Sequence, residues 1–212
     1  MNNRNEQLET LQEIRSLMER SSRFISLSGL SGVAAGIFAL IGAGFVYVYL
    51  DTLPFEHKRL YYITAQTANK WGMNYIQFFL LDAIAVLAGA ISMGIFFTTR
   101  RARRKGQTIW DSTAQRLLIN LAIPLVSGGV FCLALLYHGQ IGLIAPATLI
   151  FYGLSLVNAS KYTLSDIRYL GFLEIILGSA AMFSPGYGLE IWAIGFGILH
   201  IVYGIIMYYK YD

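Results

Sequence analysis

Long apolar runs alternate with short polar segments along most of this chain. A helix needs about 20 apolar residues to cross the ~30 Å hydrocarbon core of a membrane. Six runs approach or exceed that length, at about residues 24–50, 72–97, 117–137, 141–157, 169–183 and 189–208. We therefore expect an all-α, polytopic membrane protein with six transmembrane helices.

The segment before the first run has a different pattern. Its apolar residues recur at steps of three and four, and most charged residues lie on other faces; the apolar positions are Leu8, Leu11, Ile14, Leu17 and Met18. This spacing predicts a cytoplasmic amphipathic helix over residues 3–23. Because its acidic and basic residues are mixed, an anionic membrane surface attracts it weakly. Docking on the protein's own loops or pairing with a second copy is therefore favoured over resting on lipid.

The connections between the apolar runs predict three hairpins. Residues 138–140 and 184–188 form short turns, which make the third and fourth helices, and the fifth and sixth, antiparallel neighbours. A longer outer loop, 51–70, joins the first two helices. The chain thus divides into an N-terminal helical segment, 1–23, and a six-helix domain, 24–212, whose two halves are separated by a basic loop at 98–116.

Composition agrees with a membrane protein. Hydrophobic residues make up 56% of the 212 positions and charged residues 13%, whereas soluble domains carry about 25% charge. The single cysteine, Cys132, lies inside an apolar run. One cysteine excludes a disulfide within the chain and a cysteine-based metal site.

Basic residues define the expected orientation. The segment from Arg100 to Lys105 holds five cationic side chains in six positions, and each charge at the membrane centre costs at least ~2.5 kcal/mol. If this segment is cytoplasmic, thirteen Lys and Arg residues fall inside and three outside. The inside set is Arg4, Arg15, Arg20, Arg23, Arg100, Arg101, Arg103, Arg104, Lys105, Arg116, Lys161, Arg168 and Lys210; the outside set is Lys58, Arg59 and Lys70.

This bias predicts that both termini face the cytoplasm of a bacterial cell, in a multi-pass protein of the cytoplasmic membrane. Because the charges lie beside apolar runs, no nucleic-acid partner is expected.

Three ionisable residues lie within the predicted spans: Asp82, Glu174 and His200. Such residues are rare in spans and face an interior, a cavity or a partner. The motifs Gly171-x-x-Glu174-x-x-x-Gly178 and Gly197-x-x-His200-x-x-x-Gly204 place Glu174 and His200 on glycine-flanked faces at similar depths. We expect these two side chains to face each other, either as a structural contact or as a proton- or solute-handling site.

Two further polar residues complete the candidate intramembrane site. Asp82 needs a partner from another helix, and its structural and functional interpretations are equally supported by the sequence. Asn120 precedes Pro124 by four residues. It is expected to bond a neighbour or to relieve the carbonyl that the proline leaves without a donor.

Small residues predict close helix contacts. Ser28, Gly32 and Gly36 are spaced four apart in the first span, and Gly89 and Gly128 lie in the second and third. This spacing lets helices approach closely in lipid. It leaves open whether the partner belongs to the same chain or to a second copy.

The last hairpin carries a family resemblance. Its glycine-spaced helix from Gly171 to Gly178, its turn with Phe183 and Pro185, and its later Gly195 and Gly204 resemble the repeated hairpin of HdeD-type acid-resistance membrane proteins. The resemblance covers about 34 residues, from 171 to 204. It implies a small bacterial six-span envelope protein linked to stress, with no catalytic residues to transfer.

The sequence therefore predicts a non-enzymatic membrane protein with a structural, regulatory or envelope-stress role, and no cofactor or metal. No H-E-x-x-H, G-x-S-x-G or phosphate-binding glycine motif occurs. The alternative is a small proton-coupled solute transporter that uses Glu174, His200 and Asp82. Expected partners are the lipid bilayer and a second copy or another protein, bound through residues 3–23 and the small-residue faces. A water-filled cavity that reaches Glu174 or Asp82 would favour the transporter.

Overall fold

Helices dominate the computed structural model, which describes residues 27–55, 68–106 and 109–211. The long elements are α2 (Gly29–Leu50), α4 (Tyr75–Arg104), α5 (Ser112–Tyr137), α6 (Ile144–Ala159), α7 (Ile167–Met182) and α9 (His200–Tyr211). Between α7 and α9 lie the short helices η2 (Pro185–Tyr187) and α8 (Gly188–Trp192) and a π-helical segment, η3 (Ala193–Leu199). The expected all-α class is confirmed. The amphipathic helix expected over 3–23 lies outside the described residues.

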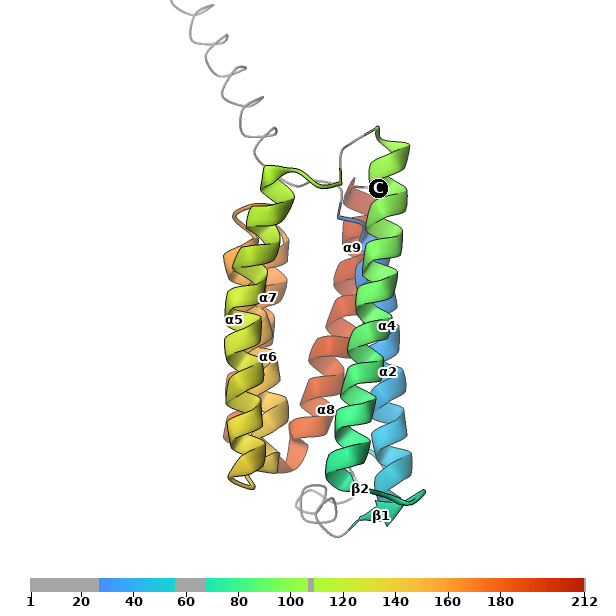
Figure 1. Cartoon of the computed structure of the whole chain (residues 1–212), viewed down its shortest axis with the longest axis vertical. Helices are drawn as coiled ribbons and strands as arrows, with labels where there is room; N and C mark the ends of the chain where they lie inside the picture. The colour runs from blue at the N-terminus through green and yellow to red at the C-terminus, as the bar shows by residue number, and fades with distance from the viewer. Residues whose placement is uncertain (1–26, 56–67, 107–108, 212) are drawn as a thin grey trace, which may run out of the picture.

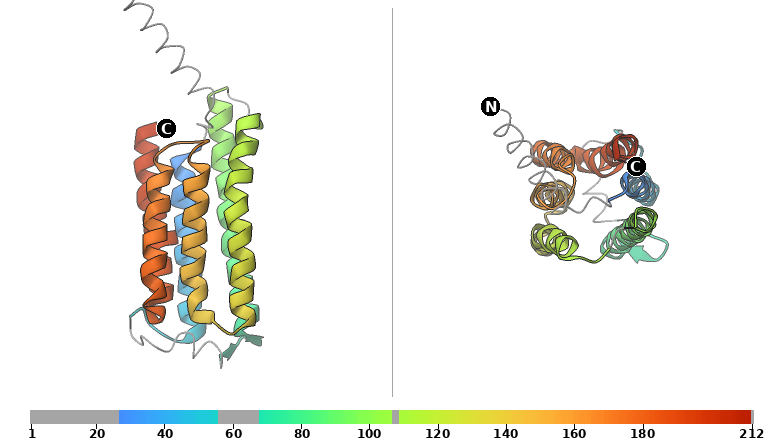
Figure 2. Two further views of the ribbon diagram at one scale, coloured as in Figure 1. Left: turned by 90° about the vertical axis from the view of Figure 1, so that its left-hand side faces the viewer. Right: turned by 90° about the horizontal axis from the view of Figure 1, so that it is seen from above.

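The helices form two layers of three (Figure 1, Figure 2). In the first layer α2 packs between α4 and α9, and in the second α6 packs between α5 and α7. The layers meet where α8 and η3 contact α6 and α7. At the opposite edge α4 and α5 stand next to each other in the ring that Figure 2 shows from above, but they do not pack as a helix pair.

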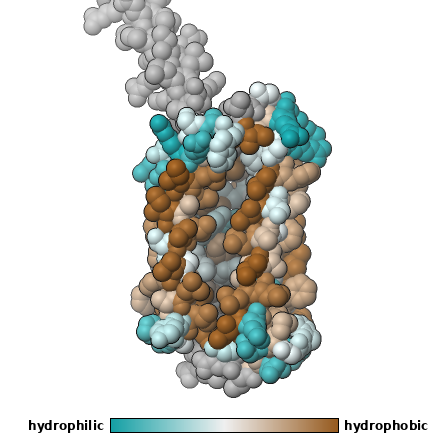
Figure 3. Space-filling model, viewed as in Figure 1, coloured by the Kyte–Doolittle hydropathy of each residue, from teal (hydrophilic) through white to brown (hydrophobic). Residues whose placement is uncertain are grey.

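Many of these helices are long and apolar enough to cross a membrane. Within the described residues, five candidate spans meet both criteria: α2, α4, α5, Ile141–Ala159 (η1 with α6) and Gly188–Tyr211 (α8 to α9). The remaining helix of the expected six, α7, has 16 residues. Figure 3 shows a broad hydrophobic belt with polar residues gathered at both ends. The helices therefore fit a membrane protein.

The basic segment is helical in its first part. Helix α4 continues to Arg104, and α5 begins at Ser112, so the connection is shorter than the loop expected at 98–116. Arg101 is buried, and its guanidinium donates to the backbone carbonyls of Leu27, just before α2, and of Tyr211, at the end of α9. A cation near a helix C-terminus stabilises the carbonyls that lack an intrahelical donor. Arg101 thus ties α4 to both of the other helices in its layer.

Glycines allow backbone contact inside each layer. A Cβ atom on Gly171 of α7 would lie 2.7 Å from the Gly153 carbonyl oxygen of α6, and one on Gly153 would lie 2.6 Å from the Gly171 carbonyl oxygen. The same reciprocal approach joins Gly29 of α2 and Gly204 of α9. Without a hydrophobic driving force in lipid, such close packing holds helices together. The small residues of the first span therefore contact a helix of the same chain.

Helices α4 and α5 pack on their layers through a different contact, in which a phenylalanine ring lies over a glycine. Phe38 of α2 fills the space beside Gly89 of α4, and Phe151 of α6 fills the space beside Gly128 of α5. Any side chain at either glycine would collide with the aromatic ring. Each layer therefore contains one glycine–glycine backbone contact and one phenylalanine–glycine contact.

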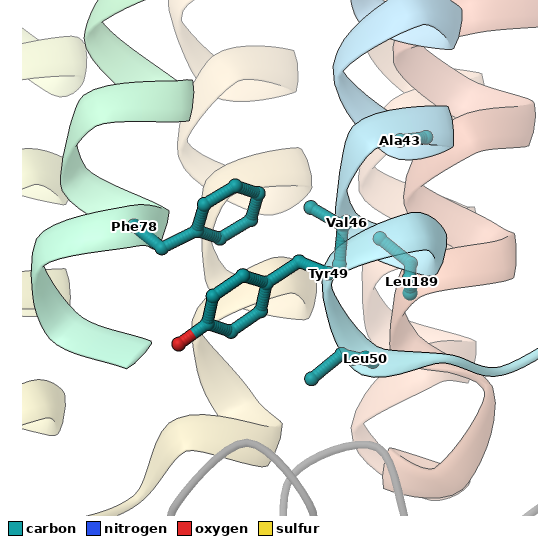
Figure 4. Packing of buried hydrophobic residues seen from close by; sticks show 6 residues of the cluster. All are labelled: Ala43, Val46, Tyr49, Leu50, Phe78 and Leu189. Carbon is teal, nitrogen blue, oxygen red and sulfur yellow. The ribbon is translucent and has the colours of Figure 1, made fainter. Parts of the chain in front are cut away.

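An aromatic cluster closes the end of α2 and α4 that lies away from the C-terminus. Tyr49 stacks on Phe78 with a centroid separation of 3.9 Å, and Figure 4 shows Val46, Leu50 and Leu189 beside them. The Tyr49 hydroxyl donates to the carbonyls of Ala68 (3.1 Å) and Met73 (2.9 Å). Ala68 directly precedes β1 (Asn69–Lys70), and Met73 is the first residue of β2 (Met73–Asn74), the strand that pairs with β1 in a short hairpin.

One face of the molecule is hollowed between the two layers. In Figure 3 two ridges run along the molecule, over α5 and α4, and the floor between them is paler than the ridges. The paler colour marks a lower hydropathy than that of the ridges. The layers are thus joined at one edge and open at the other.

Substituting alanine for Gly171 should test the backbone contact. The added Cβ would lie too close to the Gly153 carbonyl, so Gly171→Ala should lower the free energy of unfolding by ~1–3 kcal/mol. Gly129→Ala is the matched control, since a Cβ there meets nothing within 4 Å and should be neutral or slightly stabilising. Unfolding of the purified protein in detergent measures both. Equal effects at the two positions would contradict this packing.

Candidate functional site

Glu174 lies in the middle of α7, and its side chain is fully buried, with 0% exposure. Among the described residues, no donor makes a hydrogen bond to either of its carboxylate oxygens. Its one ion-pair contact is with His200, whose Nδ1 lies 3.4 Å from Oε1. The predicted proximity of Glu174 and His200 is thus present, at a distance longer than a good hydrogen bond.

His200 is the first residue of α9 and is held from both sides. Its Nδ1 lies 3.0 Å from the Gly195 carbonyl oxygen, which can only accept, so Nδ1 carries a proton. Its Nε2 lies 2.8 Å from the Tyr152 hydroxyl of α6. In the neutral ring Nε2 accepts, so Tyr152 donates to it. The imidazole is therefore fixed while its Nδ1–H also faces Glu174.

The π-helical turn before His200 makes room for Glu174. A Cβ atom on Gly195 would lie 2.5 Å from Glu174 Oε2, so only glycine fits there. π-helical turns are rare in proteins, and those that occur are often found at functional sites. In this turn the Gly195 carbonyl accepts a side-chain hydrogen bond from His200, five residues later in the chain.

The charge state of the pair follows from burial. A carboxylate without hydrogen bonds is strongly disfavoured as an isolated anion in an apolar interior. One proton must therefore reside on the pair, either on Glu174 beside a neutral imidazole or on His200 in an ion pair. Loss of that proton would leave an uncompensated negative charge between the layers.

An aromatic cluster packs against His200. Trp192, Phe196 and His200 follow one another at four-residue spacing, with ring centroids 5.1 Å and 5.8 Å apart. Tyr152 lies 4.9 Å from Phe196 and 5.3 Å from His200. Trp192, Phe196 and Tyr152 are partly exposed, unlike Glu174. We call these three residues the aromatic wall.

Sequence reasoning identified Glu174 and His200 but missed the aromatic wall. The spacing of Trp192, Phe196 and His200 was a visible signal, since side chains four apart share a helix face. Tyr152 carried no signal of its own, because its role depends on how α6 packs against α9.

The glycines of the two motifs lie elsewhere than expected. Gly171 and Gly178 of α7 face α6, and Gly197 and Gly204 face α2. None of these four glycines clears the space between Glu174 and His200; Gly195, outside both motifs, does so. The expected contact is present, but the argument from the glycine faces was wrong.

Asp82 lies apart from this pair, on α4. Its carboxylate faces Gly42 of α2, where a Cβ atom would be 3.2 Å from Oδ2. It is half-buried, at the interface between the two helices. The structure therefore does not bring Asp82 together with Glu174 and His200.

Asn120 serves the packing of α5 on α6. Its side-chain amide donates to the Arg116 carbonyl (2.8 Å). Pro124 has no N–H for the Asn120 carbonyl, and Asn158 of α6 donates to that oxygen at 2.8 Å. Asn158 also lies 3.3 Å from the Asn120 side-chain oxygen. Asn120 thus bonds a neighbour, as one of the two expectations had it, but Asn158 and not Asn120 satisfies the carbonyl that the proline leaves without a donor.

Glu174 and His200 are two side chains of types that can ligate a metal ion. Within the described residues, no group of three or more His, Cys, Asp or Glu side chains lies close enough to hold an ion. The chemistry that the site can perform with its own residues is the binding and release of a proton.

Comparison with known proteins adds no relative: no protein-family model, no curated protein and no solved structure matches this chain.

A double-mutant cycle should separate the roles of the two side chains. His200→Leu removes hydrogen bonds to Gly195 and Tyr152 and should lower the free energy of unfolding by ~1–3 kcal/mol. Glu174→Leu should be neutral or stabilising, because it removes a buried acid without hydrogen bonds. In the Glu174→Leu background, His200→Leu should cost less by about 0.6 kcal/mol or more.

Asp82→Leu provides the control for that cycle, since Asp82 lies on α4 and faces α2. Combined with His200→Leu, its effect should be additive. Strict additivity of Glu174→Leu and His200→Leu, measured by unfolding in detergent, would contradict an energetic coupling between them.

Proposed function

We propose that this chain is a six-span protein of a bacterial cytoplasmic membrane, with both termini on the cytoplasmic side. The even number of long helical segments in two layers supports this topology, with α7 as the sixth span despite its 16 residues. Arg100, Arg103 and Arg104 are exposed at one end of the molecule, where the α6–α7 connection and the C-terminal end of α9 also lie (Figure 1). That end is therefore cytoplasmic by the positive-inside rule.

Cysteine labelling tests the topology. In a Cys132→Ser background, a cysteine at Lys105 should react with an impermeant thiol reagent only after cells are opened. His138→Cys, in the turn at the opposite end, should react in intact cells. Both positions are exposed. Labelling of both from the outside would overturn the six-span proposal.

Within that membrane protein, we propose that Glu174 and His200 form a proton-binding site that drives solute transport. The observation that carries this proposal is the carboxyl group of Glu174, buried completely and without a hydrogen-bond donor. A contact kept for stability would satisfy its oxygens, because buried polar groups in native proteins almost always have partners. Groups kept in an unfavourable state are characteristic of functional sites.

The two layers are the parts of the fold whose relative position protonation could change. The layers are joined along α8 and η3 and hollowed between α4 and α5, and the motion that we propose is a change of their angle about the joined edge. The Glu174–His200–Tyr152 cluster spans them, since Glu174 and Tyr152 belong to one layer and His200 to the other. Protonation of the pair would therefore favour a closed arrangement, and loss of the proton an arrangement that admits water.

A structural or regulatory role is the second candidate, and the end of the molecule nearest the C-terminus favours it. Lys210 of α9 pairs with Asp166 before α7 at 2.7 Å, and the Tyr211 hydroxyl donates to the same carboxylate at 3.0 Å. These contacts hold the two layers together at that end. An envelope-stress role, as the HdeD-type resemblance implies, belongs to this candidate and stays a prediction.

Spin-label distances between the layers test the coupling to protons. Labels at Leu87 of α4 and Val130 of α5, both exposed, should move apart as pH rises from about 5 to about 9, where buried imidazole and carboxyl groups titrate. Loss of the pair's proton leaves a charge that hydration stabilises. Glu174→Gln should abolish the change, and Glu190→Gln in α8 should preserve it. A distance independent of pH, or a change retained in Glu174→Gln, would support the structural role.

A further inference from the structure

We propose that the solute is a hydrophobic organic cation, a lipophilic amine or quaternary ammonium or phosphonium ion, which binds on the aromatic wall beside Glu174. This inference rests on the proposed proton-coupled function and adds the substrate class. It combines three observations: a carboxyl group without donors, aromatic rings packed against its partner His200, and a hollow between the two layers.

The carboxyl group selects the charge of the ligand. Glu174 offers two oxygens that accept no hydrogen bond, so its anion needs a positive charge nearby. Among the described residues, the titratable groups facing it are His200 from α9 and Tyr152 from α6. Neither carries a permanent positive charge. A bound cation can therefore neutralise the Glu174 carboxylate in place of a proton, whereas the carboxylate would repel an anion.

The aromatic wall selects a soft, weakly hydrated cation. The ring centroid of Phe196 lies 5.1 Å from that of Trp192 and 4.9 Å from that of Tyr152, so the three rings form one continuous aromatic surface. The faces of aromatic rings attract cations, and clusters of such rings recognise quaternary ammonium groups. A small metal ion would retain its water and gain little from these rings, while an alkyl or aryl cation also buries apolar surface.

The edge between α4 and α5, where the layers do not pack, favours a ligand that is soluble in lipid. Between α4 and α5 the molecule is hollowed across its hydrophobic belt, and both helices expose almost their whole apolar length. The end nearest the C-terminus is crossed by the Asp166–Lys210 pair. At the other end the Phe55 backbone N–H donates to Glu190 at 3.3 Å. A hydrophobic cation concentrates in the bilayer and can approach the aromatic wall from the side.

Exchange of the two ligands follows from charge balance. In the resting state the pair holds one proton. When the cation binds, Glu174 is a carboxylate beside it, and the pair releases its proton to water. From the imidazolium form of His200, this proton leaves Nε2 toward the hydrogen-bonded Tyr152 hydroxyl. One positive charge replaces another, so the apolar interior never carries net charge. Binding of one cation should therefore release one proton.

Tetraphenylphosphonium is a suitable probe of this site. Titrated into the full-length protein in lipid nanodiscs, it should bind at one site and release about one proton per cation into weakly buffered solution. Glu174→Gln should weaken binding by about a hundredfold or more. Phe196→Leu and Trp192→Leu, which keep apolar bulk, should each weaken it by about threefold to thirtyfold.

Two controls make the result specific. Glu190→Gln changes a glutamate in α8, outside the proposed site, and should leave binding unchanged. Asp82→Asn, in α4, should also leave binding unchanged. The neutral analogue tetraphenylmethane should not displace the probe. Unfolding temperatures of all variants in the same nanodiscs identify any loss of fold, and Phe196→Tyr should restore binding if the ring itself is required.

The outcomes separate this inference from the proposed function. If the probe does not bind while the spin-label distance still responds to pH through Glu174, the substrate class is wrong and the proton-coupled function stands. If binding occurs equally in Glu174→Gln, the probe partitions into lipid or binds elsewhere, and the proposed site is overturned. If neither binding nor the pH response depends on Glu174, both proposals fail.

Discussion

Backbone contact between helices is the interaction on which the rest of this fold depends. Where Gly153 meets Gly171 and Gly29 meets Gly204, no side chain separates the two main chains. These contacts place α6 against α7 and α2 against α9 so closely that each pair acts as one unit. The bulkier phenylalanine–glycine contacts add α4 and α5 at the edges. The two layers, the joined edge and the open edge all follow from this difference in packing distance.

The layer arrangement also explains why the Glu174 carboxylate and the His200 imidazole lie near each other without forming a hydrogen bond. The helix that carries each residue packs closely within its own layer, α7 on α6 and α9 on α2, whereas the Glu174–His200 contact crosses between layers. The π-helical turn at η3 adds the adjustment that brings His200 between Gly195 and Tyr152. A group held by the relative position of two units reports any change in that position. This is the geometry through which the proposed function links protonation of the pair to the angle between the layers.

The sequence predicted the long apolar helices and the Glu174–His200 contact, because hydropathy and rare intramembrane charges are visible in a single chain. It could not predict which helix faces pair, since Gly171 and Gly204 look alike whichever partner they contact. The π-helical turn and the role of Tyr152 depend on tertiary packing. The basic segment was expected as a loop, but Arg101 finds carbonyl acceptors at Leu27 and Tyr211, which lets the helix continue through it.

The pairing of α2 with α9 has a consequence for the order of assembly. Helices α5, α6 and α7 are consecutive, so their layer can form from local contacts as soon as they enter the membrane. The other layer joins helices separated by more than a hundred residues, and closing such a loop is slow compared with forming a hairpin. Until α9 arrives, the glycine surface of α2 lacks its partner. During biosynthesis this surface is the one most in need of protection from incorrect pairing.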